Sequence, residues 1–471
     1  MSILIKNIHS LVTMDENFTV LHDVDLCIEG NKIAKIDKNI DARNLDKDVR
    51  IIDGAYKVVY PGFINTHHHF SQTLTRNIPA IQSVKLFDWL ILLYEIWRNL
   101  NEEFVELSTK IAVGELLLSG CTTSADQHYV FPQGASGQLL DLEIDITKEM
   151  GMRFYPNRGS MSRGKSQGGL PPDDVVQTPE QIMSDCERLI NKYYDADPFS
   201  MTKIVLAPCS PFSVTTDLMI ETAKYARKKG VMLHTHLCET KDEEAYCLKM
   251  LGKRPLAYME DCGWIGQDVS FAHGIFFNDD EIKTLANTGT GIAHCPASNM
   301  RLGSGICRVP DLLDAGVSVG LAVDGSASND SGNFVREIQI AMMINRIGAS
   351  EERMTPQKAL YLATNGGAKV LNNPKIGSIK VGNAADLAIF NMERLDFAGA
   401  MSDPMSVIVF CGAGLRTDYT IVNGKVVVEN GQLLSIDERE VFHRANAFTK
   451  KILEKTTART KIDYYKYKTK F

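Results

Sequence analysis

The sequence predicts a (β/α)8 TIM-type barrel, an α/β fold, with a small composite β-sandwich domain made from both termini. From about residue 59, short apolar runs alternate with long helical stretches, which is typical of β/α units around a parallel sheet. Strand-like runs punctuated by Gly, Asn and Asp precede this region, and similar runs return after about residue 375. A β-rich start and a β-rich end flanking one barrel indicate a single β-domain with two sequence segments.

The first segment, residues 1–58, is expected to form the N-terminal part of the β-sandwich. Its strand-like runs are ILIKNIHSLVTM, VLHDVDLCIEG, KIAKID and RIIDG.

Residues 59–375 are expected to form the catalytic barrel. Helical stretches separate several of its strands, and one of them, DLMIETAKYARKKG, ends with two Lys and a Gly, as helices commonly do. Eight candidate strands fit a closed barrel better than an open sheet. In chain order they are VVYPGFINTH, TTSADQ, MRFYPNR, KIVLAP, VMLHTHL, VSFAHG, TGIAHCP and VSVGLAVD.

The last two segments complete the expected organisation. Residues 376–436 contain the runs KIGSIKVGNAADLAIFN, DYTIVNGKVVVENG and QLLSID, which predict the C-terminal part of the β-sandwich. Residues 437–471 are rich in Lys and Arg and are expected to form a C-terminal helix and tail.

Composition restricts the class of partner. The formal net charge is -7, so a strongly basic face for a nucleic-acid polymer is not expected, and a small-molecule base is the more plausible ligand. The chain shows no signal-peptide pattern and no run of 18 apolar residues, so no membrane partner is expected. None of the ten cysteines has CxxC spacing, which favours reduced thiols and a cytoplasmic location. A homo-oligomer is also expected.

Histidines gather at one predicted strand end. In NTHHHF, period-two spacing places His67 and His69 on the same face, while His68 points the other way. Two neutral imidazoles on one face at a barrel mouth form half of a metal site.

Three further strand ends carry residues of the same chemistry. His236 ends VMLHTHL with Glu239 three residues on, His273 ends VSFAHG, and Asp324 ends VSVGLAVD. The C-terminal ends of barrel strands form the catalytic face of this fold. Neutral histidines and a carboxylate bind a divalent cation that lowers the pKa of water to about 7, and a second carboxylate can then carry a proton.

Taken together, these motifs resemble the amidohydrolase superfamily, in particular its branch of cytosine, guanine and 8-oxoguanine deaminases. The resemblance covers nearly the whole chain and rests on IKNIHSLVTMD, PGFINTHHH, HTHLCET, AHG, CPASNMRLG, VDGSASND and GSIKVGNAADLAIF. It implies Glu239 as the proton shuttle and His273 as the residue that holds or polarises the attacked group. It also implies that Asp324 accepts a proton from water. The implied metal ligands are His67, His69, His236 and Asp324.

The resemblance also implies the number of metal ions. Family members with two metals carry a bridging carboxylated Lys at the end of the fourth strand, but here that strand, KIVLAPCS, has Lys203 only at its beginning. One divalent metal is therefore expected, with Zn²⁺ favoured and Fe²⁺ as the alternative.

Three residues are candidates for substrate binding. Gln72 resembles the Gln by which guanine deaminases read a purine, since an amide both donates and accepts hydrogen bonds. Trp89 could close the pocket over a ring, and Cys209 could line it, although ordinary burial is the better explanation for both.

Other features were left open by the sequence. The roles of His128, His234 and His294 are undetermined. The segment 157–172 contains GSMSRGKS, which matches a phosphate-binding loop but is followed by QGGLPPDD, which opposes the required helix. A loop that covers the site is the alternative function for this segment.

The predicted reaction is deamination of 8-oxoguanine to urate and ammonia. PCSPFS departs from the guanine deaminase pattern PRFS, so the Arg that helps to hold guanine is replaced by Pro211 or its neighbours. The same segment, with SQTLTR, LFDWL and GCTTSADQ, looks like the 8-oxoguanine deaminases. The alternatives are deamination of guanine, isoxanthopterin or a cytosine-like ring, and triazine chloro- or aminohydrolysis. A metal-binding protein without activity is disfavoured, because a shuttle Glu accompanies the ligands.

Overall fold

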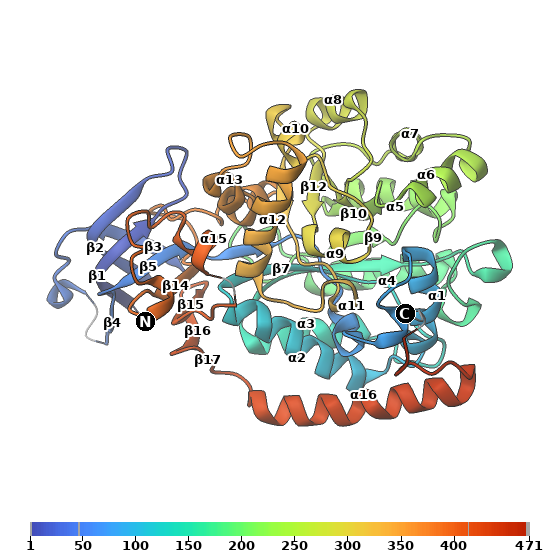
Figure 1. The fold of residues 1–471 in the computed structure, drawn as a ribbon, viewed down its shortest axis with the longest axis horizontal. Coiled ribbons are helices and arrows are strands. Elements are labelled where there is room, and N and C mark those ends of the chain that lie inside the picture. The colour runs from blue at the N-terminus through green and yellow to red at the C-terminus, as the bar shows by residue number, and fades with distance from the viewer. Residues whose placement is uncertain (1, 46–47, 413, 468–471) are drawn as a thin grey trace.

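Two sheets organise the molecule. The computed structural model describes residues 2–45, 48–412 and 414–467. One sheet has eight parallel strands and the other has nine strands of mixed direction. Figure 1 shows the mixed sheet at one end of the molecule and the parallel sheet with its helices at the other.

The parallel sheet is the predicted (β/α)8 barrel. Its strands pair in chain order, and its two edges meet where the Thr66 N–H donates to the Leu321 carbonyl over 3.0 Å. The strands are β6 (Phe63–Asn65), β7 (Cys121–His128), β8 (Arg153–Ser160), β9 (Val205–Pro208), β10 (Met232–Leu237), β11 (Val269–His273), β12 (Gly291–His294) and β13 (Val319–Leu321).

All eight predicted strand runs contribute to the barrel, but the first one is divided. Residues Lys57–Pro61 form β5 of the mixed sheet, and only Phe63–Asn65 form β6 of the barrel. Gly62 separates the two, and a Cβ atom there would lie 2.1 Å from the Thr122 hydroxyl. The chain therefore crosses between the sheets at a position where only glycine fits.

Helices follow the barrel strands, and α2 shows how their limits arise. The Asn101 side chain accepts from the Phe104 N–H and begins the helix, and the apolar residues of the helix are buried. The longer helices are α1 (Leu86–Trp97), α2 (Glu102–Leu118), α3 (Leu139–Met150), α4 (Pro179–Tyr193), α5 (Thr216–Lys229), α8 (Asp279–Thr288), α12 (Phe334–Gly348) and α16 (Glu438–Thr460). The shorter helices are α6 (Lys241–Tyr246), α7 (Pro255–Asp261), α9 (Pro296–Arg301), α10 (Val309–Asp314), α11 (Ser326–Asn329), α13 (Pro356–Tyr361), α14 (Gly367–Val370) and α15 (Val407–Cys411).

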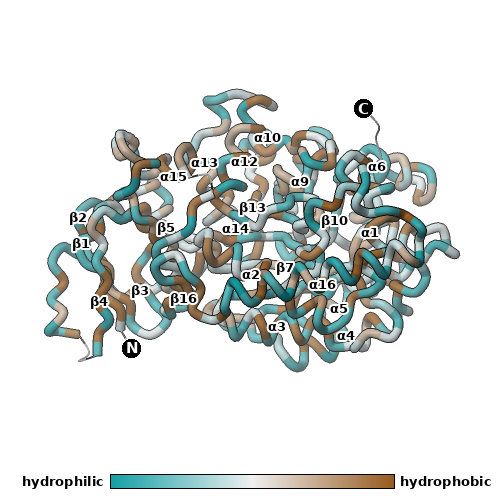
Figure 2. The backbone as a smooth tube through the Cα atoms, turned by 60° about the horizontal axis from the view of Figure 1, so that its bottom comes forward, coloured by the Kyte–Doolittle hydropathy of each residue, from teal (hydrophilic) through white to brown (hydrophobic). Residues whose placement is uncertain are grey.

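The predicted composite β-domain takes the form of one continuous mixed sheet. Strands from both ends of the chain join where β5 pairs with β14, so neither segment completes the sheet alone. Some of its apolar side chains form a separate cluster and others join the core of the barrel, and Figure 2 shows brown segments along these strands. The strands besides β5 are β1 (Ser2–Val12), β2 (Val20–Glu29), β3 (Lys32–Asp37), β4 (Arg50–Asp53), β14 (Leu387–Asn391), β15 (Tyr419–Val422), β16 (Lys425–Glu429) and β17 (Gln432–Leu433).

The C-terminal helix α16 packs on the barrel helices. Phe448 meets Phe104 of α2 edge to face, with ring centroids 5.7 Å apart. Beyond the helix, the Tyr464 hydroxyl donates to the Leu92 carbonyl of α1 over 3.1 Å. No helix in the described ranges is both long and apolar enough to cross a membrane.

A buried ion pair joins the barrel to the β-domain. Arg153 begins β8, and its guanidinium contacts the Asp386 carboxylate at 3.2 Å with both side chains almost fully buried. The same guanidinium donates to the carbonyls of Phe199 and Ser200 over 2.8 and 2.7 Å. Asp386 also accepts from the Asn423 N–H over 2.6 Å. This network fixes the orientation of the β-domain on the barrel.

We expect Asp386→Ala to destabilise the protein strongly, because it leaves the buried Arg153 charge without its partner. Loss of one partner of a buried pair costs about 3–5 kcal/mol. Urea unfolding followed by circular dichroism would measure the change. The matched control is Asp396→Ala, which removes an exposed pair with Arg394 and should cost less than about 1 kcal/mol. Equal losses in the two variants would contradict the proposed role of the buried pair.

Candidate functional site

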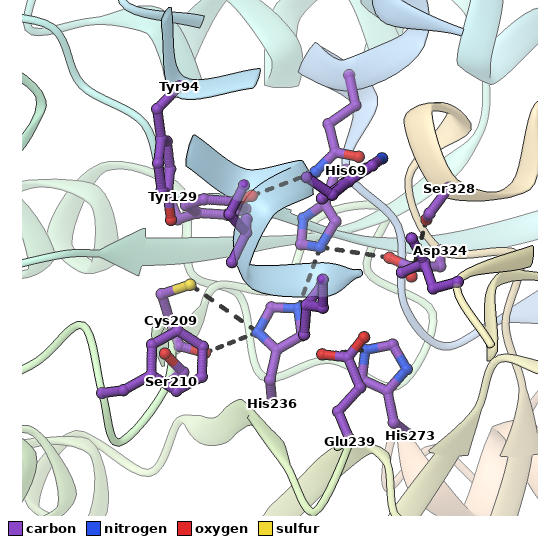
Figure 3. A pocket seen from close by; sticks show the side chains of 16 residues that line it. His69, Tyr94, Tyr129, Cys209, Ser210, His236, Glu239, His273, Asp324 and Ser328 are labelled. Carbon is purple, nitrogen blue, oxygen red and sulfur yellow. Dashed lines mark hydrogen bonds and ion pairs between the residues drawn. The ribbon is translucent and has the colours of Figure 1, made fainter. Parts of the chain in front are cut away.

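The predicted site residues meet at the C-terminal ends of the barrel strands. His67 and His69 directly follow β6, and His236 lies in the last part of β10. His273 ends β11, and Asp324 lies three residues beyond β13. Figure 3 shows His69, His236, His273 and Asp324 directed toward one another.

Three ring nitrogens and one carboxylate oxygen converge on a point. The Nε2 atoms of His69 and His236 lie 3.1 Å apart. The Asp324 Oδ1 atom lies 3.4 Å from the Nε2 atoms of both His67 and His69. His67, His69 and His236 form one compact group of potential ligands, and His67, His273 and Asp324 form another.

Hydrogen bonds on the other side of each ring determine which nitrogen faces this point. The Nδ1–H of His69 donates to the Gln127 carbonyl over 2.8 Å, and that of His236 donates to the Cys209 carbonyl over 2.6 Å. A carbonyl only accepts, so in each neutral ring the Nε2 atom carries a free lone pair. This is the tautomer that a metal ligand needs.

His67 is oriented by a second histidine. Its Nδ1 lies 2.9 Å from the His234 Nε2, and the His234 Nδ1 lies 2.8 Å from the Ser270 hydroxyl. With His67 Nε2 unprotonated, its Nδ1–H donates to His234, which in turn donates to Ser270. His234, whose role the sequence left open, therefore supports His67.

The donor set fits a divalent cation. The His67 Nε2 is buried and has no hydrogen-bond partner. Burial lowers the pKa of His67, His69 and His236, which keeps these rings neutral. Two nitrogens on one zinc ion are about 3.0–3.4 Å apart when Zn–N bonds are about 2.0–2.1 Å long. The distance between His69 and His236 agrees with this requirement.

Asp324 is held as a carboxylate. Burial alone would raise its pKa, but the neighbouring His67 ring, whose Nε2 lies 3.4 Å from Oδ1, and the charge of His273 bring the pKa well below the ordinary value. The hydroxyls of Ser298 and Ser328 donate to its Oδ2 over 2.5 and 3.2 Å. Asp324 adopts φ = 62°, a left-handed conformation that is uncommon for Asp and that aims the side chain into the site.

Glu239 and His273 face each other beside this group. The Glu239 Oε2 and the His273 Nε2 are 3.7 Å apart. Burial raises the pKa of Glu239 to about 7, so this carboxyl group can exchange a proton near neutral pH. His273 is oriented by Asn299, whose Oδ1 lies 2.9 Å from His273 Nδ1, and His273 also adopts a positive φ of 73°.

A pocket with an empty volume of about 430 Å³ opens onto these groups. The predicted substrate residues Gln72, Trp89 and Cys209 all line it. None of the described residues that line it is Lys or Arg. The remaining lining residues are His69, Leu86, Leu90, Tyr94, Tyr129, Ser210, Phe212, His236, Glu239, His273, Leu302, Asp324 and Ser328.

The Gln72 amide forms a hydrogen bond through its nitrogen, while its oxygen has no partner. Its Nε2 donates to the Tyr129 hydroxyl over 3.2 Å, while its Oε1 is buried without a partner. A Cβ atom at Gly325 would lie 1.9 Å from that Oε1, so the amide occupies space that only glycine leaves open.

Two histidines whose roles the sequence left open take structural positions. His128 Nδ1 lies 2.7 Å from the Glu143 carboxylate, and His128 Nε2 donates to the Val130 carbonyl over 3.1 Å. His294 accepts from the Asn345 amide over 3.2 Å. The described segment 157–172 contributes no residue to the pocket, and the last two residues of the motif GSMSRGKS belong to a short 3-10 helix, Lys165–Gln167.

Sequence reasoning missed the residues that support the site. Ser298 and Asn299 lie in CPASNMRLG, a segment that the family resemblance includes but without roles for these residues. Tyr129 directly follows His128 at the end of β7. Examining every polar or aromatic residue within two positions of a strand end would have found Tyr129, whereas Ser298 and Asn299 belong to α9 and carry no such signal.

Comparison with known proteins agrees with this geometry. The amidohydrolase family matches residues 58–427, which is most of the chain. An 8-oxoguanine deaminase from Pseudomonas aeruginosa is 47% identical over 84% of this chain and 88% of its own. A hydroxydechloroatrazine ethylaminohydrolase from Pseudomonas sp. (strain ADP) is 35% identical over 94% of each chain. The crystal structure of atrazine chlorohydrolase from Arthrobacter aurescens TC1 complexed with zinc has a TM-score of 0.90 and 32% identity, covering 95% of this chain and 100% of that one.

These similarities extend over both sheets as well as the strand-end residues. The predicted resemblance is confirmed, and this chain belongs to the amidohydrolase family.

Proposed function

We propose that this protein is a metal-dependent deaminase that converts 8-oxoguanine and water to urate and ammonia. The observation that carries the proposal is the arrangement of Glu239 and His273 beside the three converging histidines and Asp324, at the edge of a pocket that no described Lys or Arg lines. The 47% identity with an 8-oxoguanine deaminase supports the choice of substrate.

His67, His69, His236 and Asp324 would hold one divalent cation, with zinc favoured and iron as the alternative. A zinc ion in such a site lowers the pKa of water to about 7. The crystal structure of the related atrazine chlorohydrolase contains zinc, which supports the choice of metal. Lys203 lies before β9, at the opposite end from the histidines, which supports one metal ion rather than two.

Glu239, His273 and Asp324 would move and hold the protons. Glu239 would take a proton from the attacking water and deliver it to a ring nitrogen, a role that suits a pKa of about 7. His273 would hold the attacked group, since Asn299 fixes its orientation. Asp324 would accept the second proton and pass it to the leaving ammonia.

Gln72, Trp89 and Cys209 would recognise the base. The free Oε1 of Gln72 offers a hydrogen-bond acceptor to an N–H on the ring edge. Burial raises the pKa of Cys209 to about 12, so it presents a neutral thiol. An 8-oxo group converts N7 of the purine from an acceptor to a donor, which suits a pocket that offers acceptors and no Arg.

Triazine hydrolysis is the second candidate, since an ethylaminohydrolase and a chlorohydrolase of triazines are both similar over nearly the whole chain. Deamination of guanine, isoxanthopterin or a cytosine-like ring is the remaining alternative. The expected cytoplasmic location stays a prediction. The homo-oligomer stays a prediction.

We expect one divalent metal ion per chain. Elemental analysis of active protein should give close to one equivalent, and His67→Ala and Asp324→Ala should lower metal content because each removes a ligand. His443→Ala, which changes an exposed histidine of α16, should leave it unchanged. Two equivalents in fully active protein would refute the single-metal site.

Glu239→Gln should lose activity and keep the metal. The amide retains the shape of the side chain but does not ionise, and general acid–base catalysis contributes about 10²–10⁴-fold. Coupled ammonia detection would measure kcat, and metal analysis of the same sample is the control. Near-normal turnover would remove Glu239 from the mechanism.

For substrate choice, kcat/KM for 8-oxoguanine should exceed that for guanine in one preparation. A buried group left unpaired costs about 1–3 kcal/mol, which gives roughly 5- to 150-fold discrimination. The panel should also contain isoxanthopterin, cytosine, isocytosine and aminotriazines. A ratio below one, or ammonia from a pyrimidine or triazine alone, would overturn this substrate and leave the deaminase chemistry intact.

A further inference from the structure

A second buried glutamate lies behind Glu239. Glu243 is the third residue of α6, and its side chain is almost fully buried. Its two carboxylate oxygens accept from two consecutive backbone N–H groups, those of Cys238 over 3.1 Å and Glu239 over 2.8 Å. The carboxylate therefore bridges the peptide segment that carries Glu239.

This arrangement differs from ordinary helix capping. At α8, the Glu281 carboxylate accepts from the N–H of the N-cap Asn278, and Asn278 accepts from the Glu281 N–H, each over 2.9 Å. At α6, the N-cap Thr240 accepts from the Glu243 N–H over 3.2 Å, but the Glu243 carboxylate reaches past Thr240 to the two preceding residues. The carboxylate therefore forms hydrogen bonds with the segment just after β10 rather than with the N-terminus of its own helix.

The bridged segment has a conformation that needs support. Cys238 adopts φ = 56°, in the left-handed region that non-glycine residues seldom occupy. Its carbonyl accepts from the N–H groups of Ile275 and Phe276 over 2.9 and 3.1 Å, just beyond His273. The turn that carries Glu239 is thus tied to β11 on one side and to Glu243 on the other.

Burial of the Glu243 carboxylate has a free-energy cost that simple packing does not explain. Burial of a carboxylate is unfavourable unless strong hydrogen bonds compensate for the lost hydration, and hydrogen bonds to a charged acceptor are about twice as strong as neutral ones. Glu243 also places a second carboxyl group close to Glu239, where two negative charges repel each other. An apolar side chain would fill this space without either cost, but it would leave two backbone N–H groups unpaired.

We propose that Glu243 is a positioning residue for proton transfer, whose carboxylate holds the Cys238–Glu239 peptide so that the Glu239 side chain stays opposite His273. This inference rests on the proposed role of Glu239 as the proton carrier. It does not depend on which ring is the substrate.

Glu243→Gln distinguishes this role from simple packing. The amide has nearly the same shape, but only its oxygen accepts a hydrogen bond, and its NH2 group would face a backbone N–H. We expect kcat to fall about 10- to 100-fold, as for other residues that orient catalytic groups, with KM changed by less than about threefold. Glu244→Gln is the matched control, because the neighbouring Glu244 pairs with Arg254 in a part-buried position and should keep kcat.

A double-mutant cycle tests whether Glu243 acts through Glu239. In a Glu239→Gln background, adding Glu243→Gln should change kcat by less than about twofold, because the group that it positions is already inactive. An equal loss in both backgrounds, or wild-type kcat in Glu243→Gln, would overturn the proposal.

Hydrogen–deuterium exchange of the peptide that spans residues 236–243 gives a readout that needs no substrate. Faster exchange in Glu243→Gln than in Glu244→Gln is expected, because one of the two backbone N–H groups loses its acceptor. Unchanged exchange would overturn the proposal even if activity fell. If the wild type released no ammonia from any base, the proposed function would fail, and exchange alone would decide whether Glu243 holds the turn.

Discussion

The site depends on three imidazole rings whose Nδ1–H groups are each held by a fixed acceptor. Two of these acceptors are backbone carbonyls, that of Gln127 near the end of β7 and that of Cys209 just after β9, and the third is His234. With the protons held outward, the three Nε2 lone pairs of these buried rings face one point. A divalent cation at that point would accept all three lone pairs, so the donor set fits a metal site.

The surroundings of the carboxyl groups also determine their charge. Asp324, Glu239 and Glu243 are all buried, and each is compensated differently. Asp324 receives hydrogen bonds from two serine hydroxyls and faces His67, which keeps it ionised. Glu239 lacks such donors, so burial raises its pKa toward neutrality and makes it suited to proton transfer. The different environments of the two carboxyl groups therefore shift their pKa values in opposite directions.

The rest of the fold holds this polar centre rigid. The barrel places the C-terminal ends of its strands side by side. At the other, N-terminal end of β8, the buried pair of Arg153 and Asp386 joins the composite β-domain to the barrel. The left-handed backbone at Cys238, His273 and Asp324 shows that three strand ends are strained where they aim side chains inward. A well-packed barrel tolerates such local strain because its cost is small beside the burial of the core.

The sequence by itself determined the fold class and the residues that meet at the site. Parallel strands in a barrel all end on one face, so His67, His236, His273 and Asp324 had to converge wherever their strands lay. Alternation along the predicted strand NTHHHF likewise separated His68 from its two neighbours. These inferences need only periodicity and chain order.

Only the tertiary structure decided how these residues are supported. That His234 orients His67 while His128 binds Glu143 follows from which side of each strand faces the site and which helix packs behind it. The bridge from Glu243 and the serines at Asp324 depend on short helices whose direction no periodic pattern determines. A hydrogen bond between residues distant in the chain forms only if packing brings the two groups within about 3 Å of each other. The end of a strand, in contrast, follows from the local sequence.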